Sequence, residues 1–320
     1  MKNILFITST RIGDAILSTG LLSYILRTYP EARITVACGP LVASLFEGIP
    51  RLERVIPLPK QSWNRHWIKL WRQTVGTKWD VVVDLRNSAV SRLIRADQRF
   101  IYGPHINRAD HKVVQNAAVM QVREADAQPR LFLTPRQMEE AAALIPDGRP
   151  VLGVGPTANW IGKIWPVENF MELIGQLSAE GEVFAGWRIA VFGAPGEEAI
   201  ANRLYDSLPP DRRINCIAKG SPGQAAAYLA RCGFYIGNDS GLMHSAAAAG
   251  IQTVGLFGPT NDTLYAPYGP RTALIRTPET FAELTGQSGF DAKTITESLM
   301  KNLTVETVAQ GIRNQIGKHP

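Results

Sequence analysis

Three polar turns of the chain carry residue types that bind phosphate or move a proton. The first is Asp239-Ser240-Gly241, which lies between the apolar run 234–237 and the small-residue run 245–249. Asp and Ser are favoured helix N-caps, and the free N–H groups of a helix N-terminus bind anions. His244 falls in the first turn of the predicted helix, on the side of that site. We therefore predict an anion site here; an ordinary capped helix with a packed histidine is the alternative.

The second turn follows the apolar run 151–154 and contains Thr157 and Lys163. It is not a P-loop, because that motif needs Gly where Thr157 stands and Ser or Thr where Ile164 follows Lys163. The turn nevertheless places a hydroxyl and an ammonium group between a strand and a helix that starts near Pro166. Lys163 is either a phosphate ligand or a solvated loop charge.

The third turn, residues 8–14, lies between the first predicted strand and the first predicted helix. It lacks the Gly-x-Gly-x-x-Gly pattern, which argues against a dinucleotide-dependent oxidoreductase. Asp14 stands where the helix begins and is either its N-cap or a general base. The two roles conflict in part, because a carboxylate bonded to helix N–H groups is stabilised as the anion and loses basicity.

Strands and helices alternate along the whole chain, which predicts an α/β fold of two doubly wound parallel sheets. The predicted strands are 4–7, 34–37, 54–58, 81–85, 151–154, 188–192, 214–218, 234–237 and 253–257, and the clearest helices are 14–27, 167–180, 197–207 and 221–232. A Pro- and Gly-containing stretch, 146–150, marks the linker. In such sheets ligands bind beyond the carboxyl ends of the strands, where all three polar turns lie.

The composition is that of a globular protein, with 45% hydrophobic and 19% charged residues. No apolar run is long enough to cross a bilayer, and three widely spaced cysteines indicate a reducing cytoplasm. The histidines lack metal-ligand spacing, so no metal is expected. Basic charge is concentrated in residues 1–147, with 20 Lys and Arg against 13 Asp and Glu. This half either binds an anionic partner or is simply a solubilising surface.

Tryptophans recur at positions 63, 67 and 71, a spacing that places them on one face of a helix. Cationic residues stand among them: Lys60, Arg65, Lys69 and Arg72. The stripe either packs into the core or forms an interfacial helix that contacts acidic lipid or an amphipathic acceptor. Trp67 can distinguish the two, because only a core residue would destabilise the fold when truncated.

Together the turns resemble glycosyltransferase family 9, the heptosyltransferases, over nearly the whole chain. The segments that carry the resemblance occur in family order: Ser9–Asp14, Thr157 with Lys163–Pro166, Phe192–Glu198, Asp239-Ser240-Gly241 with His244, and Gly255–Thr260. The resemblance implies a GT-B fold, two Rossmann-like domains that face each other across a cleft. It also implies transfer of a sugar, typically heptose from ADP-heptose, to the lipopolysaccharide inner core with inversion at the anomeric carbon.

The resemblance assigns roles to individual residues. Asp14 would be the base, and the donor would be bound by Gly13, Thr157, Lys163, Glu197, Asp239, Ser240, Gly241 and His244. Acceptor-binding candidates in the basic half are Arg11, Lys60, Arg65 and Lys69. No cofactor and no metal are expected. Residues 1–147 would bind the acceptor and 148–303 the nucleotide sugar, whereas 304–320, with a helix at 304–316, would pack back on the first domain.

The expected partners are thus a nucleotide-sugar donor and an anionic lipopolysaccharide-type acceptor. The expected location is the cytoplasm, with peripheral contact at the inner face of the membrane. Two other functions stay open. A nucleotide-sugar 2-epimerase or hydrolase would not need the basic acceptor half. A non-enzymatic nucleotide- or nucleic-acid-binding module would use the basic charge, but no aromatic-interleaved recognition motif is present, so no nucleic acid is expected as a partner.

Overall fold

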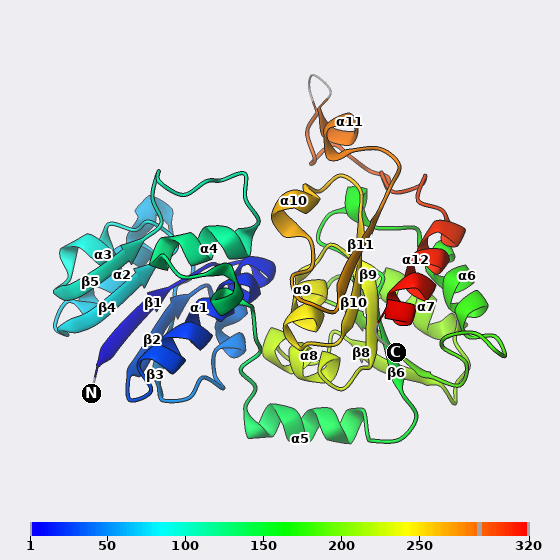
Figure 1. Ribbon diagram of the computed structural model, residues 1–320, viewed down its shortest axis with the longest axis horizontal. Coiled ribbons are helices and arrows are strands. Elements are labelled where there is room, and N and C mark those ends of the chain that lie inside the picture. Colours follow the sequence, from blue (N-terminus) through cyan, green and yellow to red (C-terminus); the bar gives the residue numbers. More distant parts are fainter. Residues whose placement is uncertain (1, 287–289, 319–320) are drawn as a thin grey trace. The chain divides into compact units, whose positions relative to one another are not determined.

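The computed structural model describes residues 2–286 and 290–318 and divides into two compact units (Figure 1). The first consists of Met1–Met138 with Ser221–Gly223, and the second of Glu139–Gly220 with Gln224–Pro320. Both are α/β units built on an entirely parallel sheet, as predicted. Among the described residues, no helix is both long and apolar enough to cross a membrane.

The first unit has a five-stranded sheet of order β3-β2-β1-β4-β5. Its strands are β1 (Asn3–Ile7), β2 (Arg33–Cys38), β3 (Leu52–Pro57), β4 (Trp79–Asp84) and β5 (Ala96–Ile101). Its helices are α1 (Ile12–Thr28), α2 (Arg65–Thr74), α3 (Val90–Leu93) and α4 (Lys112–Met120), with 3-10 turns η1 (Pro40–Leu45), η2 (Ser62–Asn64) and η3 (Glu124–Ala127). Ile4–Ile7 at the centre of the sheet are fully buried, because helices cover both faces.

The second unit has a six-stranded sheet of order β11-β10-β9-β6-β7-β8. Its strands are β6 (Val151–Gly155), β7 (Arg188–Gly193), β8 (Arg213–Ile217), β9 (Phe234–Asn238), β10 (Gln252–Phe257) and β11 (Thr272–Arg276). The remaining helices are α5 (Pro135–Leu144), η4 (Ile161–Lys163), α6 (Val167–Leu177), α7 (Glu198–Ser207), α8 (Pro222–Leu229), α9 (Gly241–Ala248), α10 (Asp262–Tyr265), α11 (Phe281–Thr285) and α12 (Val305–Lys318).

Each sheet has one point at which the strand order reverses. In the first unit it lies between β1 and β4, and in the second between β6 and β9. At such a point the loops that leave neighbouring strands diverge to opposite faces and open a crevice at the carboxyl edge. All three polar turns lie there: residues 8–14 follow β1, residues 156–166 follow β6, and residues 239–241 follow β9.

The C-terminal helix is part of the second unit, where α12 packs against α6 and β11. Its buried stripe, Val308, Ala309 and Ile312, belongs to the same hydrophobic core as α6, and Arg313 pairs with Glu182 at 3.0 Å. Packing of residues 304–320 on the first domain stays a prediction. Residues 319–320 of the predicted C-terminal segment lie outside the described residues.

Candidate functional site

The turn after β9 is held rigidly at the carboxyl edge of the second sheet. All five residues of β9 are buried, and the Asp239 N–H donates to the Leu256 carbonyl of β10 at 3.2 Å. Ser240 has extended backbone angles and is the N-cap of α9, as predicted. The first-turn N–H groups of a helix have no partner within it, so they remain available to an anion. Small buried residues, Ala246–Ala248, let α9 lie close to the sheet.

The loop that carries Lys163 is fixed from two sides. On one side, the Asn238 side-chain oxygen at the end of β9 accepts a hydrogen bond from the Trp165 N–H at 3.0 Å. On the other, the Leu299 N–H donates to the Gly162 carbonyl at 2.9 Å and the Ser298 hydroxyl donates to the Ile164 carbonyl at 2.6 Å. The Lys163 backbone therefore has a fixed place beside the turn after β9, although Lys163 lies in a loop.

Lys163, Asp239 and His244 form one cluster. Lys163 Nζ lies 3.2 Å from Asp239 Oδ2, and His244 Nε2 lies 3.9 Å from Asp239 Oδ1. The three side chains are 16%, 8% and 3% exposed, respectively. A carboxylate this buried requires a cationic or hydrogen-bonding partner, and Lys163 supplies it. Because the cluster adjoins the N-terminus of α9, an incoming phosphate would meet an ammonium group and free backbone donors together.

Thr157 and Glu197 form a second pair on the other side of the reversal point. The Thr157 hydroxyl donates to Glu197 Oε2 at 2.6 Å, and the Ala194 N–H donates to the same oxygen at 3.0 Å. Thr157 is 1% exposed, and Glu197 is the N-cap residue of α7. The structure thus groups the predicted donor residues of the second half into two sets. One is Thr157 with Glu197, after β6 and β7. The other is Lys163, from the loop after β6, with Asp239 and His244, after β9.

Tyr235 lies next to the candidate site and was not singled out from the sequence. Its fully buried ring lies on one face of the sheet, against Gly155 and Gly237, which pair in the register of β6 and β9. A methyl group on Gly155 would lie 2.1 Å from the Tyr235 hydroxyl oxygen, and one on Gly237 would lie 2.4 Å from it. Glycine at both positions therefore makes room for a phenol at the end of the sheet. The only signal in the sequence was glycine within strands, which marks a close approach.

Asp14 lies in the first turn of α1 but does not cap it. The N-cap is Arg11, so the N-cap interpretation of Asp14 is wrong. The Ser9 hydroxyl points to Asp14 Oδ2 at 3.5 Å and accepts from the Arg11 N–H at 3.2 Å. Asp14 and Gly13 are half-buried and Arg11 is exposed. Asp14 therefore lies in the first turn of α1 without serving as its cap.

Asp84, at the end of β4, is a second carboxylate at the same edge, and it was not singled out from the sequence. It is fully buried and accepts hydrogen bonds from the Arg86 N–H, the Ser88 N–H and the Ser88 hydroxyl, at 2.7–2.8 Å. These three hydrogen bonds anchor the loop that follows β4. In the sequence, the feature that could have indicated it is a single Asp at the end of the apolar run 81–83, shortly before the polar residues Arg86–Ser88.

The tryptophan stripe does not form one helical face. α2 begins at Arg65, and Trp63 lies before it in η2 with a positive φ of 58°, followed by Asn64 at 56°. Trp63 is 90% exposed and Trp71 37%, whereas Trp67 packs partly into the core of the first unit. The predicted acceptor residues Lys60, Arg65 and Lys69 are exposed on this segment. Core packing therefore describes Trp67, whereas the exposure expected of an interfacial residue describes Trp63.

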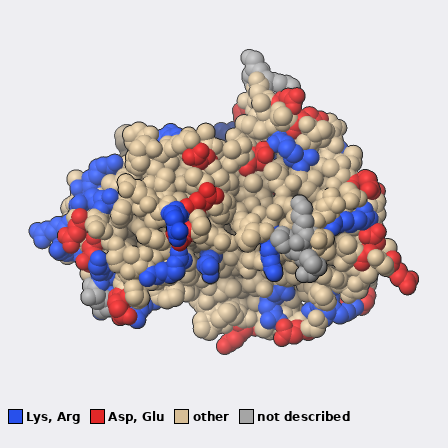
Figure 2. Space-filling model, viewed as in Figure 1, with Lys and Arg blue, Asp and Glu red and all other residues tan. Residues whose placement is uncertain are grey.

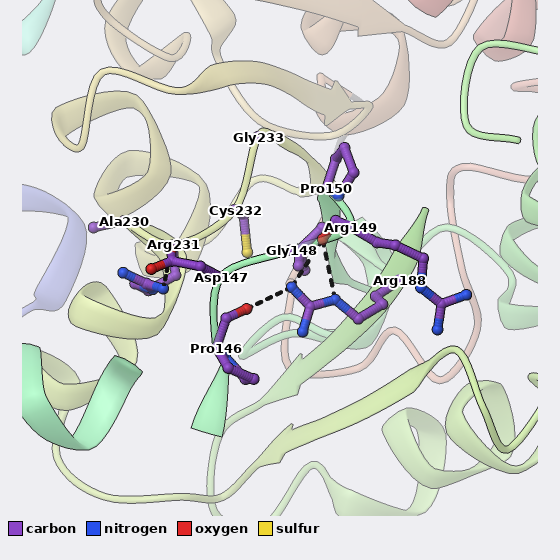
Figure 3. A pocket seen from close by; sticks show the side chains of 11 residues that line it. Pro146, Asp147, Gly148, Arg149, Pro150, Arg188, Ala230, Arg231, Cys232 and Gly233 are labelled. Atoms are coloured by element: carbon purple, nitrogen blue, oxygen red, sulfur yellow. Dashed lines mark hydrogen bonds and ion pairs between the residues drawn. The ribbon is translucent and has the colours of Figure 1, made fainter. Parts of the chain in front are cut away.

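A separate pocket of about 330 Å³ lies at the opposite edge of the second sheet (Figure 3). It is lined by the linker 146–150, by Arg188 at the start of β7, and by Ala230–Gly233 before β9. Arg188 donates to the Pro146 and Arg149 carbonyls at 2.6 and 2.8 Å, and Arg231 pairs with Asp147 at 2.6 Å. These guanidinium groups hold the linker, and the pocket faces the amino ends of the strands, away from the polar turns.

Across residues 2–286 and 290–318, no group of three or more His, Cys, Asp or Glu side chains is arranged to hold a metal ion. Charge is distributed unevenly over the chain, and lysines and arginines appear at several places on the face of the first unit drawn in Figure 2.

Burial raises the pKa of the thiol of Cys38 in the first unit and of Cys216 in the second to about 12, so both are inert thiols.

Comparison with known proteins identifies the family. The model of glycosyltransferase family 9 (heptosyltransferase) matches residues 95–289. Lipooligosaccharide heptosyltransferase 2 of Haemophilus influenzae is 26% identical, with 86% of this chain and 88% of that protein covered. Lipopolysaccharide heptosyltransferase 2 of Escherichia coli is 24% identical, with 85% and 87% covered.

Solved structures agree in fold. A family 9 glycosyltransferase from Veillonella parvula superposes with a TM-score of 0.79 at 19% identity, covering 99% of this chain and 97% of that one. E. coli ADP-heptose lipopolysaccharide heptosyltransferase II gives 0.73 at 21% identity, with 99% of both chains covered. E. coli heptosyltransferase WaaC with ADP gives 0.73 at 20% identity, covering 98% and 99%. The predicted fold class and family are confirmed: the chain belongs to glycosyltransferase family 9, the heptosyltransferases, and has the GT-B fold.

Proposed function

We propose that this glycosyltransferase moves heptose from ADP-heptose to an inner-core lipopolysaccharide acceptor, with inversion at the anomeric carbon. The relatives named above are lipopolysaccharide or lipooligosaccharide heptosyltransferases, which supports the sugar and the acceptor class. E. coli WaaC, which shares the fold, has been solved with ADP and with ADP-2-deoxy-2-fluoro heptose. In this proposal residues 1–147 form the acceptor domain and residues 148–303 the donor domain.

The observation that carries the proposal is the cluster of Lys163, Asp239 and His244 at the N-terminus of α9. Transfer breaks the bond between the anomeric carbon and the diphosphate oxygen, so negative charge builds up on the leaving nucleoside diphosphate. Lys163, 3.2 Å from Asp239, and the N–H groups of Ser240 and Gly241 are fixed before the reaction begins. Groups held in place this way stabilise a developing charge without reorganising. Thr157 and Glu197 then belong to the nucleoside part of the donor site.

The other half of the reaction needs a base. The acceptor hydroxyl forms a bond to the anomeric carbon from the face opposite the diphosphate and gives up its proton, which we assign to Asp14. Gly13, next to Asp14, is half-buried, and Arg11 is exposed beside them. Asp14→Asn keeps the size of the side chain and removes the base, so turnover should fall about 10²–10⁴-fold while ADP affinity stays unchanged. Near-normal turnover would exclude Asp14 as the base.

Exposed cations and apolar side chains of the first unit support an anionic, amphipathic acceptor and peripheral contact with a membrane. Lys60, Arg65 and Lys69 are exposed, and Trp63 presents 90% of its surface. Each well-placed cation contributes about 1 kcal/mol of attraction to acidic lipid, which salt screens, whereas an indole anchors independently of salt. Arg65→Glu with Lys69→Glu should therefore weaken binding to vesicles of acidic phospholipid at low salt, and Trp63→Ala should weaken it at any salt. Normal binding by both variants would contradict the contact.

The donor is tested most directly by product analysis. Purified protein is incubated with ADP-heptose, with and without a deacylated inner-core oligosaccharide, and the products are identified by mass spectrometry. We expect a mass gain of one heptose on the oligosaccharide together with release of ADP. Donor consumption without the oligosaccharide, at the same rate as with it, would instead support the hydrolase or 2-epimerase alternative. GDP- and UDP-linked sugars serve as controls for the nucleotide base.

A further inference from the structure

Two buried hydroxyls at the carboxyl edge of the second sheet, those of Tyr235 and Ser240, face each other, and neither has a well-formed hydrogen bond to any other described residue. Leaving a hydroxyl buried and unpaired is costly, so native structures almost always satisfy such groups. Ser240 is the more unusual of the two. A serine at an N-cap normally accepts a hydrogen bond from its own helix, and Ser240 does not cap α9 in this way.

The two hydroxyls belong to one place in the fold. The Tyr235 hydroxyl lies against the main chain of Gly155 and Gly237, which pair at the carboxyl ends of β6 and β9. Ser240 follows Gly237 by three residues and starts α9. Burial raises the pKa of Tyr235 above its usual range, and the nearby Ser240 hydroxyl offsets this only in part. Tyr235 is therefore protonated at neutral pH and is a hydrogen-bond donor.

An anion at the N-terminus of α9 would complete this arrangement. A phosphate oxygen accepts several hydrogen bonds, and the first-turn N–H groups of α9 already favour it there. The Ser240 hydroxyl can donate to that oxygen while it accepts from Tyr235, which leaves neither hydroxyl unpaired. The glycines at 155 and 237 then have a function, because any side chain there would meet the phenol oxygen at 2.1–2.4 Å.

We propose that Tyr235 is a positioning residue of the donor site: its buried hydroxyl orients the Ser240 hydroxyl toward a diphosphate oxygen of the donor. The inference rests on the proposed function in that the diphosphate belongs to a nucleotide sugar. Tyr235 acts through Ser240 and takes no part in the bond changes. The ring itself also fills the space under Gly153, Gly155 and Gly237, so that removing the whole side chain would test packing and not positioning.

Tyr235→Phe removes only the hydroxyl, and binding is measured by calorimetry with two probes, ADP and inorganic pyrophosphate. Loss of a hydrogen-bond chain to a charged group should weaken both about 10-fold. The melting temperature of the ligand-free variant should differ little from that of the wild type, since the phenol loses its contact with the Ser240 hydroxyl but no well-formed hydrogen bond to another described residue. Tyr228→Phe is the matched control: its buried hydroxyl is hydrogen-bonded to Gln224, so this change should lower the melting temperature and leave both affinities unchanged.

Ser240→Ala supplies a second, independent variant. It should weaken both probes to a similar extent, and the double variant should be little worse than either single one, because the two hydroxyls act in one chain. Unchanged affinity in Tyr235→Phe, or additive losses in the double variant, would overturn the inference. If the wild type bound pyrophosphate but not ADP, the proposed donor would be wrong, and the pyrophosphate measurements would still decide the role of Tyr235.

Discussion

Replacement of Lys163 by methionine tests the centre of the proposed donor site. Methionine keeps an unbranched side chain of similar length and removes the ammonium group that lies 3.2 Å from Asp239. A hydrogen bond to a charged group contributes about 1.5–3 kcal/mol. ADP affinity should therefore fall by about 10- to 150-fold. Because the turn is held from both sides by Asn238 and the segment 298–299, the loop should keep its place in the variant.

The same change has a second, separable effect on stability. Asp239 is 8% exposed and would lose the ammonium group at 3.2 Å, while His244 Nε2 would remain at 3.9 Å. A buried group that loses its partner costs about 1–3 kcal/mol, and a domain of this size loses about 2–4 °C of melting temperature per kcal/mol. The ligand-free variant should thus melt several degrees lower. Lys163→Arg keeps the charge and should recover most of this loss.

Calorimetry with ADP and a thermal melt without ligand read the two effects separately. Lys301→Met is the control, because Lys301 also pairs with a carboxylate, Glu297, but both side chains are more than half exposed. Exposed pairs contribute little, so neither affinity nor melting temperature should change measurably. Wild-type ADP affinity in Lys163→Met would refute the assignment of Lys163 to the diphosphate, whatever happened to the melting temperature.

Three further outcomes concern the first unit. Trp67→Ala should lower the free energy of unfolding by about 3 kcal/mol, because Trp67 packs partly into the core. Trp63→Ala, at a 90% exposed position, should change it by less than about 0.5 kcal/mol. Equal losses for the two variants in urea unfolding would contradict this difference. Asp84→Ala leaves three donors at the end of β4 unpaired and should destabilise the unit by about 3 kcal/mol, which a urea melt would detect. Burial, and then the charges of Arg86 and Lys60, lower the pKa of His66 in the folded state. The folded state should therefore lose stability as the pH drops through the pKa of the unfolded state, near 6.5, because only the unfolded chain takes up a proton there. His66→Phe should flatten this pH dependence of the melting temperature.

The fold was largely predictable because its strands are short apolar runs buried on both faces. All nine predicted strands match β1 to β4 and β6 to β10 to within two residues at either end. β5 was missed because residues 97–99 are exposed and polar, as an edge strand allows, and β11 because its residues are at most half-buried. Neither carries the apolar run that reveals a buried strand.

The candidate site of the second unit was predictable from its turns because much of it is local in sequence. Asp239, Ser240, Gly241 and His244 lie within a span of six residues, so a strand-turn-helix pattern is enough to place them together. The pairing of Asp239 with Lys163, 76 residues earlier, needed the parallel register of β6 and β9, and this is a property of the sheet alone. Tyr235 escaped notice for the same reason: its partners Gly155 and Gly237 become neighbours only once β6 and β9 pair.

The first unit shows where the spacing of residues fails to predict a helical face. The four-residue spacing of Trp63, Trp67 and Trp71 predicts one helical face only if a single helix contains all three, and the positive φ at Trp63 and Asn64 breaks it. The real buried face of α2 is His66, Leu70 and Thr74, which repeats with the same period three residues later. Two interleaved four-residue repeats therefore compete in one segment. The repeat that contains Leu70 is the buried one, because Leu70 packs in the same core cluster as Trp79 and Val82 of the sheet. Trp63, from the other repeat, is left exposed and is the side chain on which contact with a membrane would depend.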